Sequence, residues 1–376
     1  MEVLAEKGGE MKKAPLGPFL SVLSPAALQQ FNQPFVVGEV STPKGAVPQV
    51  SSRLTFRDHW GTFKARWGIR RMDYKIVPGL YALGNPDKES PVVVTANYKM
   101  SFDKLRGALG NHDAWILVLD TKGINVWCAA GKGTFGTEEL IFRLKITGLE
   151  KIVHHRNLIL PQLAAPGVSA HEVKKQSGFT VHYGPIKATD LPLYLKRGLR
   201  ATPEMRQKTF SFLERLVLVP IELIKALQIV FIAALLLLLL GLIRNKGAFN
   251  MTDPHNVFLP ILSLLWSVLW GAVLFPLFLP FLPGRAFSTK GIFLGIIAVT
   301  VFSLISLNYI DSTIENVLSL NLVMLAAITY LAMNFTGAST FTSLSGVRKE
   351  MRWALPLEIA LGVFGSILWF FSFLTA

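Results

Sequence analysis

The chain has 376 residues, of which 51% are hydrophobic and 16% charged, and its net charge is +14. The charged share is below the roughly 25% of a soluble domain. Because the long apolar runs lie after residue 215, the sequence predicts a water-soluble domain followed by a membrane domain. Lysine and arginine are scattered over the first half without a basic stripe. We therefore expect no nucleic-acid partner and assign the positive charge to the cytoplasmic side of a membrane.

Residues 1–50 are rich in Pro, Gly, Ser and Ala without a sustained period, which predicts mostly irregular chain. Pro15 and Pro18 interrupt the short apolar stretch after Met11, so a secretory signal is not expected and the N-terminal domain should stay in the cytoplasm. Either Met1 or Met11 can serve as the start.

Residues 51–185 alternate short apolar strands with helical segments. The pattern predicts strands near 91–96, 114–120 and 158–160, and helices near 101–109, 137–144 and 168–176, with Ser101 as an N-cap. Such alternation is typical of an α/β, Rossmann-like fold with a parallel sheet, in which ligands bind beyond the carboxyl ends of the strands. Three loops should meet there: residues 97–99, the segment around Cys128, and residues 161–167.

Residues 186–218 form a basic linker, for which contact with anionic lipid headgroups and an ordinary solvated surface both remain open. The all-α transmembrane domain, 219–376, should contain five helices, near 219–243, 257–279, 291–309, 316–336 and 354–374. We expect no charge near the middle of any span, which speaks against an ion-coupled transporter.

The charges of the loops predict the orientation of these helices. The predicted inner loops contain Arg285, Lys290, Arg348, Lys349 and Arg352, and the outer loops contain Arg244, Lys246, Asp311 and Glu315. The distribution predicts a multi-pass protein of the cell (inner) membrane with its C-terminus outside.

Cys128 is the only cysteine, which excludes an internal disulfide and an iron–sulfur cluster built by this chain alone. It is either a small buried apolar residue or a ligand, and its Gly and Ala neighbours allow a close approach. Gly131-Lys-Gly-Thr-Phe-Gly136 fits a dinucleotide pattern, but Arg156 stands where a ribose-binding acid is needed. We therefore set nucleotide binding aside.

The segment Asn-Val-Trp-Cys-Ala-Ala-Gly-Lys, residues 125–132, closely resembles the signature of the mercury-methylation corrinoid protein family, HgcA. The resemblance covers most of the chain, including residues 94–102, 160–167 and 335–340. The soluble domain is more distantly similar to the corrinoid domain of the corrinoid iron–sulfur protein of the acetyl-CoA pathway. The lower-ligand motif Asp-x-His-x-x-Gly of other cobalamin enzymes is absent, since Asp58-His59-Trp60-Gly61 has the wrong spacing.

The resemblance implies a membrane-anchored methyltransferase that transfers a methyl group from a cobalamin-type corrinoid, with its benzimidazole base off cobalt, to Hg(II). Cys128 is then the catalytic residue and the lower axial ligand of cobalt. The residues expected to hold the corrinoid are Thr95, Asn97, Lys99, Asn125, Val126, Trp127, Cys128, Ala129, Ala130, Gly131, Lys132, Gln162, Leu163, Ala165, Pro166 and Gly167. Trp127 can pack equally well on the ring or in the core.

The implied partners are a ferredoxin-like iron–sulfur protein, HgcB, as electron donor, and a methyl donor from one-carbon (folate) metabolism. Two alternatives remain. One is a corrinoid methyl carrier of one-carbon metabolism with incidental mercury activity. The other is a metal transporter with a soluble sensor domain, which predicts paired cysteines along the spans, where the sequence has none.

Overall fold

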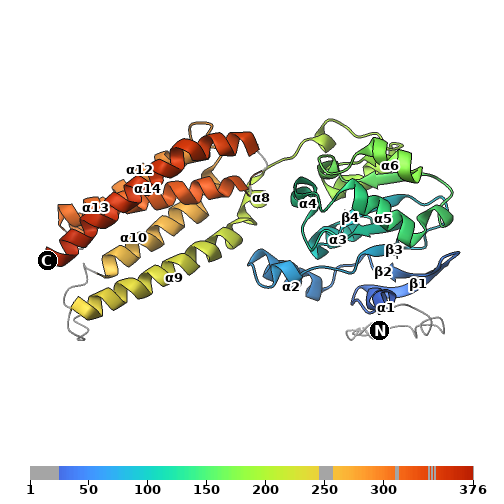
Figure 1. Cartoon of the computed structure of the whole chain (residues 1–376), viewed down its shortest axis with the longest axis horizontal. Helices are drawn as coiled ribbons and strands as arrows, with labels where there is room; N and C mark the ends of the chain where they lie inside the picture. The colour runs from blue at the N-terminus through green and yellow to red at the C-terminus, as the bar shows by residue number, and fades with distance from the viewer. Residues whose placement is uncertain are drawn as a thin grey trace, which may run out of the picture. The chain divides into compact units, whose positions relative to one another are not determined.

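The computed structural model describes residues 25–244, 257–309, 313–337, 339, 342 and 344–375. The chain forms two compact units. The first consists of residues 1–65 and 69–208, and the second of residues 66–68 and 209–376. An α/β unit followed by a helical unit is therefore confirmed (Figure 1).

The first unit is built on a seven-stranded mixed sheet with the order β1-β2-β3-β5-β4-β6-β7. Its strands are β1 (Val36–Thr42), β2 (Gly45–Val50), β3 (Gly79–Leu83), β4 (Val92–Ala96), β5 (Ala114–Leu119), β6 (Asn157–Leu160) and β7 (Thr180–Tyr183). Strands β5, β4, β6 and β7 run parallel to one another, whereas β3 is antiparallel to β5 and β1 is antiparallel to β2. The expectation of a purely parallel sheet is wrong at these two pairs.

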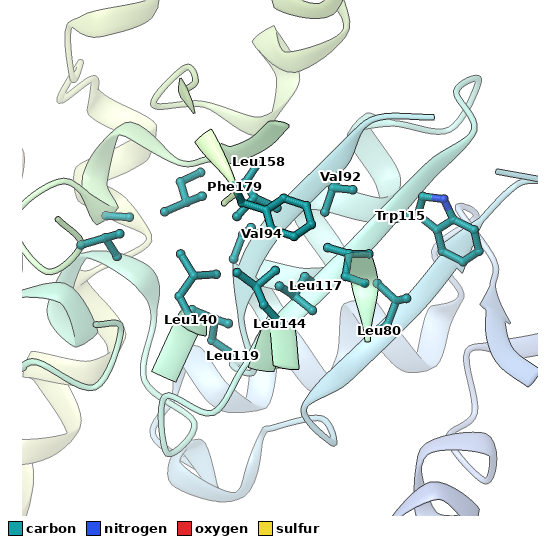
Figure 2. Packing of buried hydrophobic residues seen from close by; sticks show 14 of the residues in the cluster. Leu80, Val92, Val94, Trp115, Leu117, Leu119, Leu140, Leu144, Leu158 and Phe179 are labelled. Carbon is teal, nitrogen blue, oxygen red and sulfur yellow. The ribbon is translucent and has the colours of Figure 1, made fainter. Parts of the chain in front are cut away.

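Helices cover both faces of this sheet. They are α1 (Pro25–Phe31), α2 (Phe56–Arg66), α3 (Lys99–Ala108), α4 (Val126–Lys132), α5 (Thr137–Thr147), α6 (Ala170–Ser177) and α7 (Leu191–Lys196). Because successive strand residues point to opposite faces, Val94 joins the core under α4, α5 and α6, while Val93 joins the core under α1, α3 and α7. Figure 2 shows the first of these cores, to which α5 contributes Leu140 and Leu144 and β5 contributes Leu117 and Leu119.

Several boundaries differ from those expected. Residues 25–50 form α1, β1 and β2, so the prediction of irregular chain is wrong there; residues 1–24 lie outside the described residues. Helix α3 begins two residues before Ser101 and its N-cap is Tyr98, so Ser101 is not the cap. Residues 186–208 belong to the first unit, with Tyr194 and Met205 buried in its core, and are not a separate linker.

Among the described residues of the second unit, five helices are long and apolar enough to cross a membrane: residues 212–243, 258–278, 287–307, 314–337 and 345–374. They comprise α8 (Phe212–Leu216) with α9 (Val219–Arg244), α10 (Phe258–Val268) continued by η8 (Leu269–Leu274) and α11 (Phe275–Phe278), α12 (Phe287–Tyr309), α13 (Ile314–Asn334) and α14 (Leu344–Thr375). The expected number of candidate membrane-spanning helices, five, is confirmed for the described residues. Lys246 and Asp311 of the expected outer loops lie outside the described residues.

The fifth span corrects one expectation. Helix α14 begins at Leu344, about ten residues earlier than expected, which places Glu358 near its middle. Glu358 is 4% exposed, and Glu350 on the same helix accepts hydrogen bonds from the backbone N–H and hydroxyl of Ser288. The expectation that no ionisable residue lies near the middle of a span is therefore wrong for Glu358, and it no longer counts against an ion-coupled transporter.

Candidate functional site

The carboxyl end of β4 holds the turn that follows β5. Asn97 comes directly after β4, is 2% exposed, and its Oδ1 accepts hydrogen bonds from Thr121 N (3.1 Å), Thr121 Oγ1 (2.9 Å) and Gly123 N (2.9 Å). Its Nδ2 donates to Asp120 Oδ1 at 3.1 Å. A single buried amide therefore fixes the chain that leads from β5 to the cysteine segment.

Cys128 lies in the first turn of α4. Asn125 is the N-cap of this helix, and its side-chain Oδ1 accepts a hydrogen bond from the Cys128 backbone N–H at 2.9 Å. Asn and Asp are favoured at this position because they satisfy a backbone donor that the helix leaves open. The cap sets where α4 starts and thereby which side of the helix carries the thiol.

The two sides of α4 differ sharply. Val126, Ala129 and Ala130 are buried in the core over the sheet, whereas Trp127 and Cys128 are half-buried. A Cβ added at Gly131 would meet no atom within 4 Å, so the helix is open on that side. Cys128 is therefore not the fully buried apolar residue that a free cysteine most often is.

The loop after β6 approaches α4 closely. Helix η4 (Gln162–Ala164) contacts α4, and a Cβ at Gly167 would lie 2.2 Å from the carbonyl oxygen of Phe135 and 2.9 Å from Cα of Ala130. Only glycine allows this approach. The three loops expected at this edge of the sheet are thus brought together, since the first is bonded to the second and the second packs on the third.

Lys99 does not extend into open space. Its Nζ contacts Asp58 Oδ1 and Asp103 Oδ2, both at 2.6 Å, and Arg106 contacts the same two carboxylates at 3.0 and 2.8 Å. Burial of Asp58 works to raise its pKa, but hydrogen bonds from Lys99 and Thr55 outweigh it and hold the pKa well below its usual range. This network joins α2 to α3.

The other expected site residues are also placed. Thr95 is 3% exposed within β4, and Gln162 accepts a hydrogen bond from Arg206. Lys132 is exposed at the end of α4, while Leu163 and Ala165 are half-buried in the third loop and Pro166 is exposed. The side chains free to meet a ligand are thus those on the open side of α4 and in the third loop.

The ion-pair network of Asp58, Lys99, Asp103 and Arg106 was not predicted from the sequence. Its helical half left a signal, because Lys99, Asp103 and Arg106 have the three- and four-residue spacing of neighbours on one helix face. Asp58 comes from a distant helix and gave no such signal.

Cys128 is the metal donor that the open side of α4 carries. No group of three or more His, Cys, Asp or Glu side chains suited to a metal ion occurs in the described part of the chain. A bare metal ion is therefore a poor match there. A metal whose equatorial positions are filled by a macrocycle needs only an axial donor from the protein, and a half-buried thiol on an open helix face fits that need.

Part of the first unit is similar in sequence to known proteins. Residues 71–195 match the family model described as CO dehydrogenase/acetyl-CoA synthase delta subunit. The acetyl-CoA decarbonylase/synthase complex subunit gamma of Methanopyrus kandleri is 33% identical over 129 residues, which are 34% of this chain and 28% of that protein. The subunit of the same name from Methanothermobacter thermautotrophicus is 33% identical over 129 residues, with the same shares of the two chains.

A third such subunit, from Methanocaldococcus jannaschii, is 32% identical over 128 residues, which are 34% of this chain and 26% of that protein. The chain thus spans only about a quarter of the length of these relatives. The matches support the distant similarity of the soluble unit to the corrinoid protein of the acetyl-CoA pathway, and the matched residues run from just before β3 into α7.

Proposed function

We propose that this protein is a membrane-anchored, corrinoid-dependent methyltransferase that methylates Hg(II), with Cys128 as the lower axial ligand of cobalt. The observation that carries the proposal is the half-buried thiol on the open side of α4, at the carboxyl edge of the sheet. Ligands bind at this edge in α/β folds. The match of residues 71–195 to the acetyl-CoA synthase family supports a corrinoid-binding unit around it.

The corrinoid, when bound, supplies a cobalt centre that carries the methyl group. The chain's own residues hold the donor in place. Asn125 caps α4 through the Cys128 N–H, and Asn97 fixes the turn before it. Cys128 would hold the cobalt as a thiolate, because metal coordination deprotonates a thiol, and the bound corrinoid would supply the methyl group for Hg(II).

The partners follow from what the chain lacks and from the family it resembles. One cysteine cannot hold an iron–sulfur cluster, so electrons that restore the cobalt must come from a partner, for which we propose the ferredoxin-like HgcB. We propose one-carbon (folate) metabolism as the source of the methyl group. The α/β unit lies in the cytoplasm in this proposal, with the five helices in the cell membrane.

A second candidate is a corrinoid methyl carrier of one-carbon metabolism. The names of the relatives, subunits of acetyl-CoA decarbonylase/synthase complexes, favour it. Competition between Hg(II) and a folate or thiol acceptor for the methyl group separates the two. If the methyl group goes mainly to Hg(II), the result supports the mercury methyltransferase. If it goes to the folate or thiol acceptor even when Hg(II) is present, the result supports the methyl carrier.

Substitution of the cysteine tests the proposal. Cys128→Ala should abolish methylmercury formation without unfolding the first unit, because Ala is small and favours a helix. Cys128→Thr keeps a weak oxygen donor and should retain part of the activity. Methylmercury formation with cobalamin-loaded, full-length protein is the readout, and full activity of the Ala variant would rule out the axial role.

A further inference from the structure

Helix α2 exposes an aromatic stripe that the site does not use. Phe56 is 82% exposed, Trp60 49% and Phe63 45%, and the rings of Trp60 and Phe63 stack with centroids 5.1 Å apart. At about 100° per residue these three positions fall within about 60° of one another around the helix. Such a stripe on a soluble surface usually marks an interaction site.

The opposite side of α2 fixes the helix to its own unit. Asp58 and Ala65 point there; Asp58 is 8% exposed and Ala65 1%. Asp58 contacts Lys99 and Arg106, and Tyr74 Oη donates a hydrogen bond to the Asp58 carbonyl at 3.1 Å. The aromatic stripe therefore faces outward because the other face is anchored.

The stripe is bordered by positive charge. Residues 53–75 contain seven lysines and arginines and two aspartates, and one of these, Asp58, is already paired inward. Arg57 lies beside the stripe and is exposed, with Lys64 on the same flank. Ile69 and Met72 add exposed apolar surface just beyond the helix, at 53% and 60% exposure.

We propose that α2 docks on the surface of an anionic phospholipid bilayer, with Phe56, Trp60 and Phe63 at the headgroup boundary and Arg57 and Lys64 on lipid phosphates. Exposed Phe and Trp side chains with basic side chains on their flank are the pattern of interfacial helices. Five helices among the described residues are long and apolar enough to span a membrane, so in this proposal a bilayer is close in the chain to the first unit. The positive border excludes a cationic protein as the favoured occupant and matches anionic lipid.

Hydrogen exchange on the full-length protein in lipid nanodiscs tests the docking. Amides of residues 56–66 should exchange severalfold more slowly in discs that contain phosphatidylglycerol than in discs of phosphatidylcholine alone. The double variant Arg57→Gln/Lys64→Gln should lose this lipid-dependent protection by about fivefold for each charge removed. Phe142→Ser on α5, at a residue 52% exposed, is the matched control and should leave it unchanged.

Quenching of Trp60 fluorescence by brominated lipid provides the second measurement. The chain has eight tryptophans, so the signal of Trp60 is the difference between the protein and its Trp60→Phe variant. Strong quenching in anionic discs, weakened by high salt, supports the proposal. Equal exchange of residues 56–66 in both kinds of disc, no quenching of Trp60, or protection that rises with protein concentration, as for a second copy, would each overturn it.

Discussion

At the scale of single residues, Asn97 and Asn125 decide where the thiol of Cys128 lies. The sequence placed both near a ligand, because an asparagine after a strand or before a helix is equally suited to a cofactor and to the backbone. The structure shows that the side-chain oxygen of Asn97 accepts hydrogen bonds from Thr121 and Gly123, and that of Asn125 accepts one from the Cys128 N–H. Which neighbour a polar side chain bonds depends on contacts distant in the chain, so the sequence alone could not decide it.

Asn97→Ala should loosen the turn before α4. It removes the acceptor of two buried backbone N–H groups, so local opening of residues 121–128 should become easier by about 2–4 kcal/mol. Hydrogen exchange of those amides measures the change. Asn111→Ala, in an exposed loop position, is the control and should have little effect; equal effects of the two variants would contradict the role assigned to Asn97.

At the scale of elements, strands β4, β5 and β6 were predictable because they are continuous apolar runs, and helices α3, α5 and α6 because their apolar residues have helical spacing. Strands β1 and β2 were missed, since β1 alternates buried and exposed residues imperfectly and β2 contains Pro48. Strands β3 and β7 were missed as well, and the antiparallel direction of β3 depends on its pairing with β5 rather than on a local pattern. The meeting of the three loops at one edge of the sheet was nevertheless predicted, because it depends only on β4, β5 and β6.

Two glycines of the site should respond oppositely to alanine. Gly131→Ala adds a methyl group where nothing lies within 4 Å, so the apoprotein should gain about 0.5–1 kcal/mol of helix stability while cobalamin binding weakens. Gly167→Ala forces the third loop from α4 and should cost about 1–3 kcal/mol. Thermal unfolding and cobalamin titration measure both, and unchanged cobalamin binding by the Gly131 variant would place the corrinoid elsewhere.

The stability that the ion pairs between α2 and α3 give to the first unit should depend on pH. Because the folded-state pKa of Asp58 is held below its usual value, its stabilising effect is present above about pH 4 and is lost as the pH falls through the folded-state pKa. Thermal unfolding followed by circular dichroism, in a series from pH 7 down to pH 2, should show the loss beginning below about pH 4 and growing as the pH falls further. Asp58→Asn should be less stable at pH 7 and flatter below pH 4; a steep acid response that survives in this variant would assign it to other carboxylates.

At the scale of the whole molecule, composition alone separated a basic α/β unit from a helical membrane unit, because an apolar run of about twenty residues has the length that a helix needs to cross a bilayer. The extent of the last helix was not predictable from hydropathy, since α14 begins in a charged stretch around Arg348 and Lys349 and includes Pro356. That earlier start is what moves Glu358 to mid-helix. Long helices continue through polar residues when neighbouring helices pack on them.

The proposed orientation predicts an external C-terminus. A periplasmic alkaline phosphatase reporter fused after Ala376 should be active, whereas a reporter that fluoresces only in the cytoplasm should be dark at that position. The physical reason is the excess of lysine and arginine in the inner loops. Fluorescence of the C-terminal fusion would show that the C-terminus lies in the cytoplasm, which would contradict the proposed orientation and place the α/β unit outside.

The visible absorption spectrum of the full-length protein with bound cobalamin tests the central claim most directly, because the colour of cobalt(III) reports its lower ligand. If Cys128 holds the cobalt, the spectrum should be that of cobalamin with its benzimidazole base off cobalt and a thiolate bound, and in Cys128→Ala it should change to that of a weaker ligand while cobalamin stays bound. A spectrum identical in the two proteins, or a protein that remains colourless after reconstitution, would contradict it.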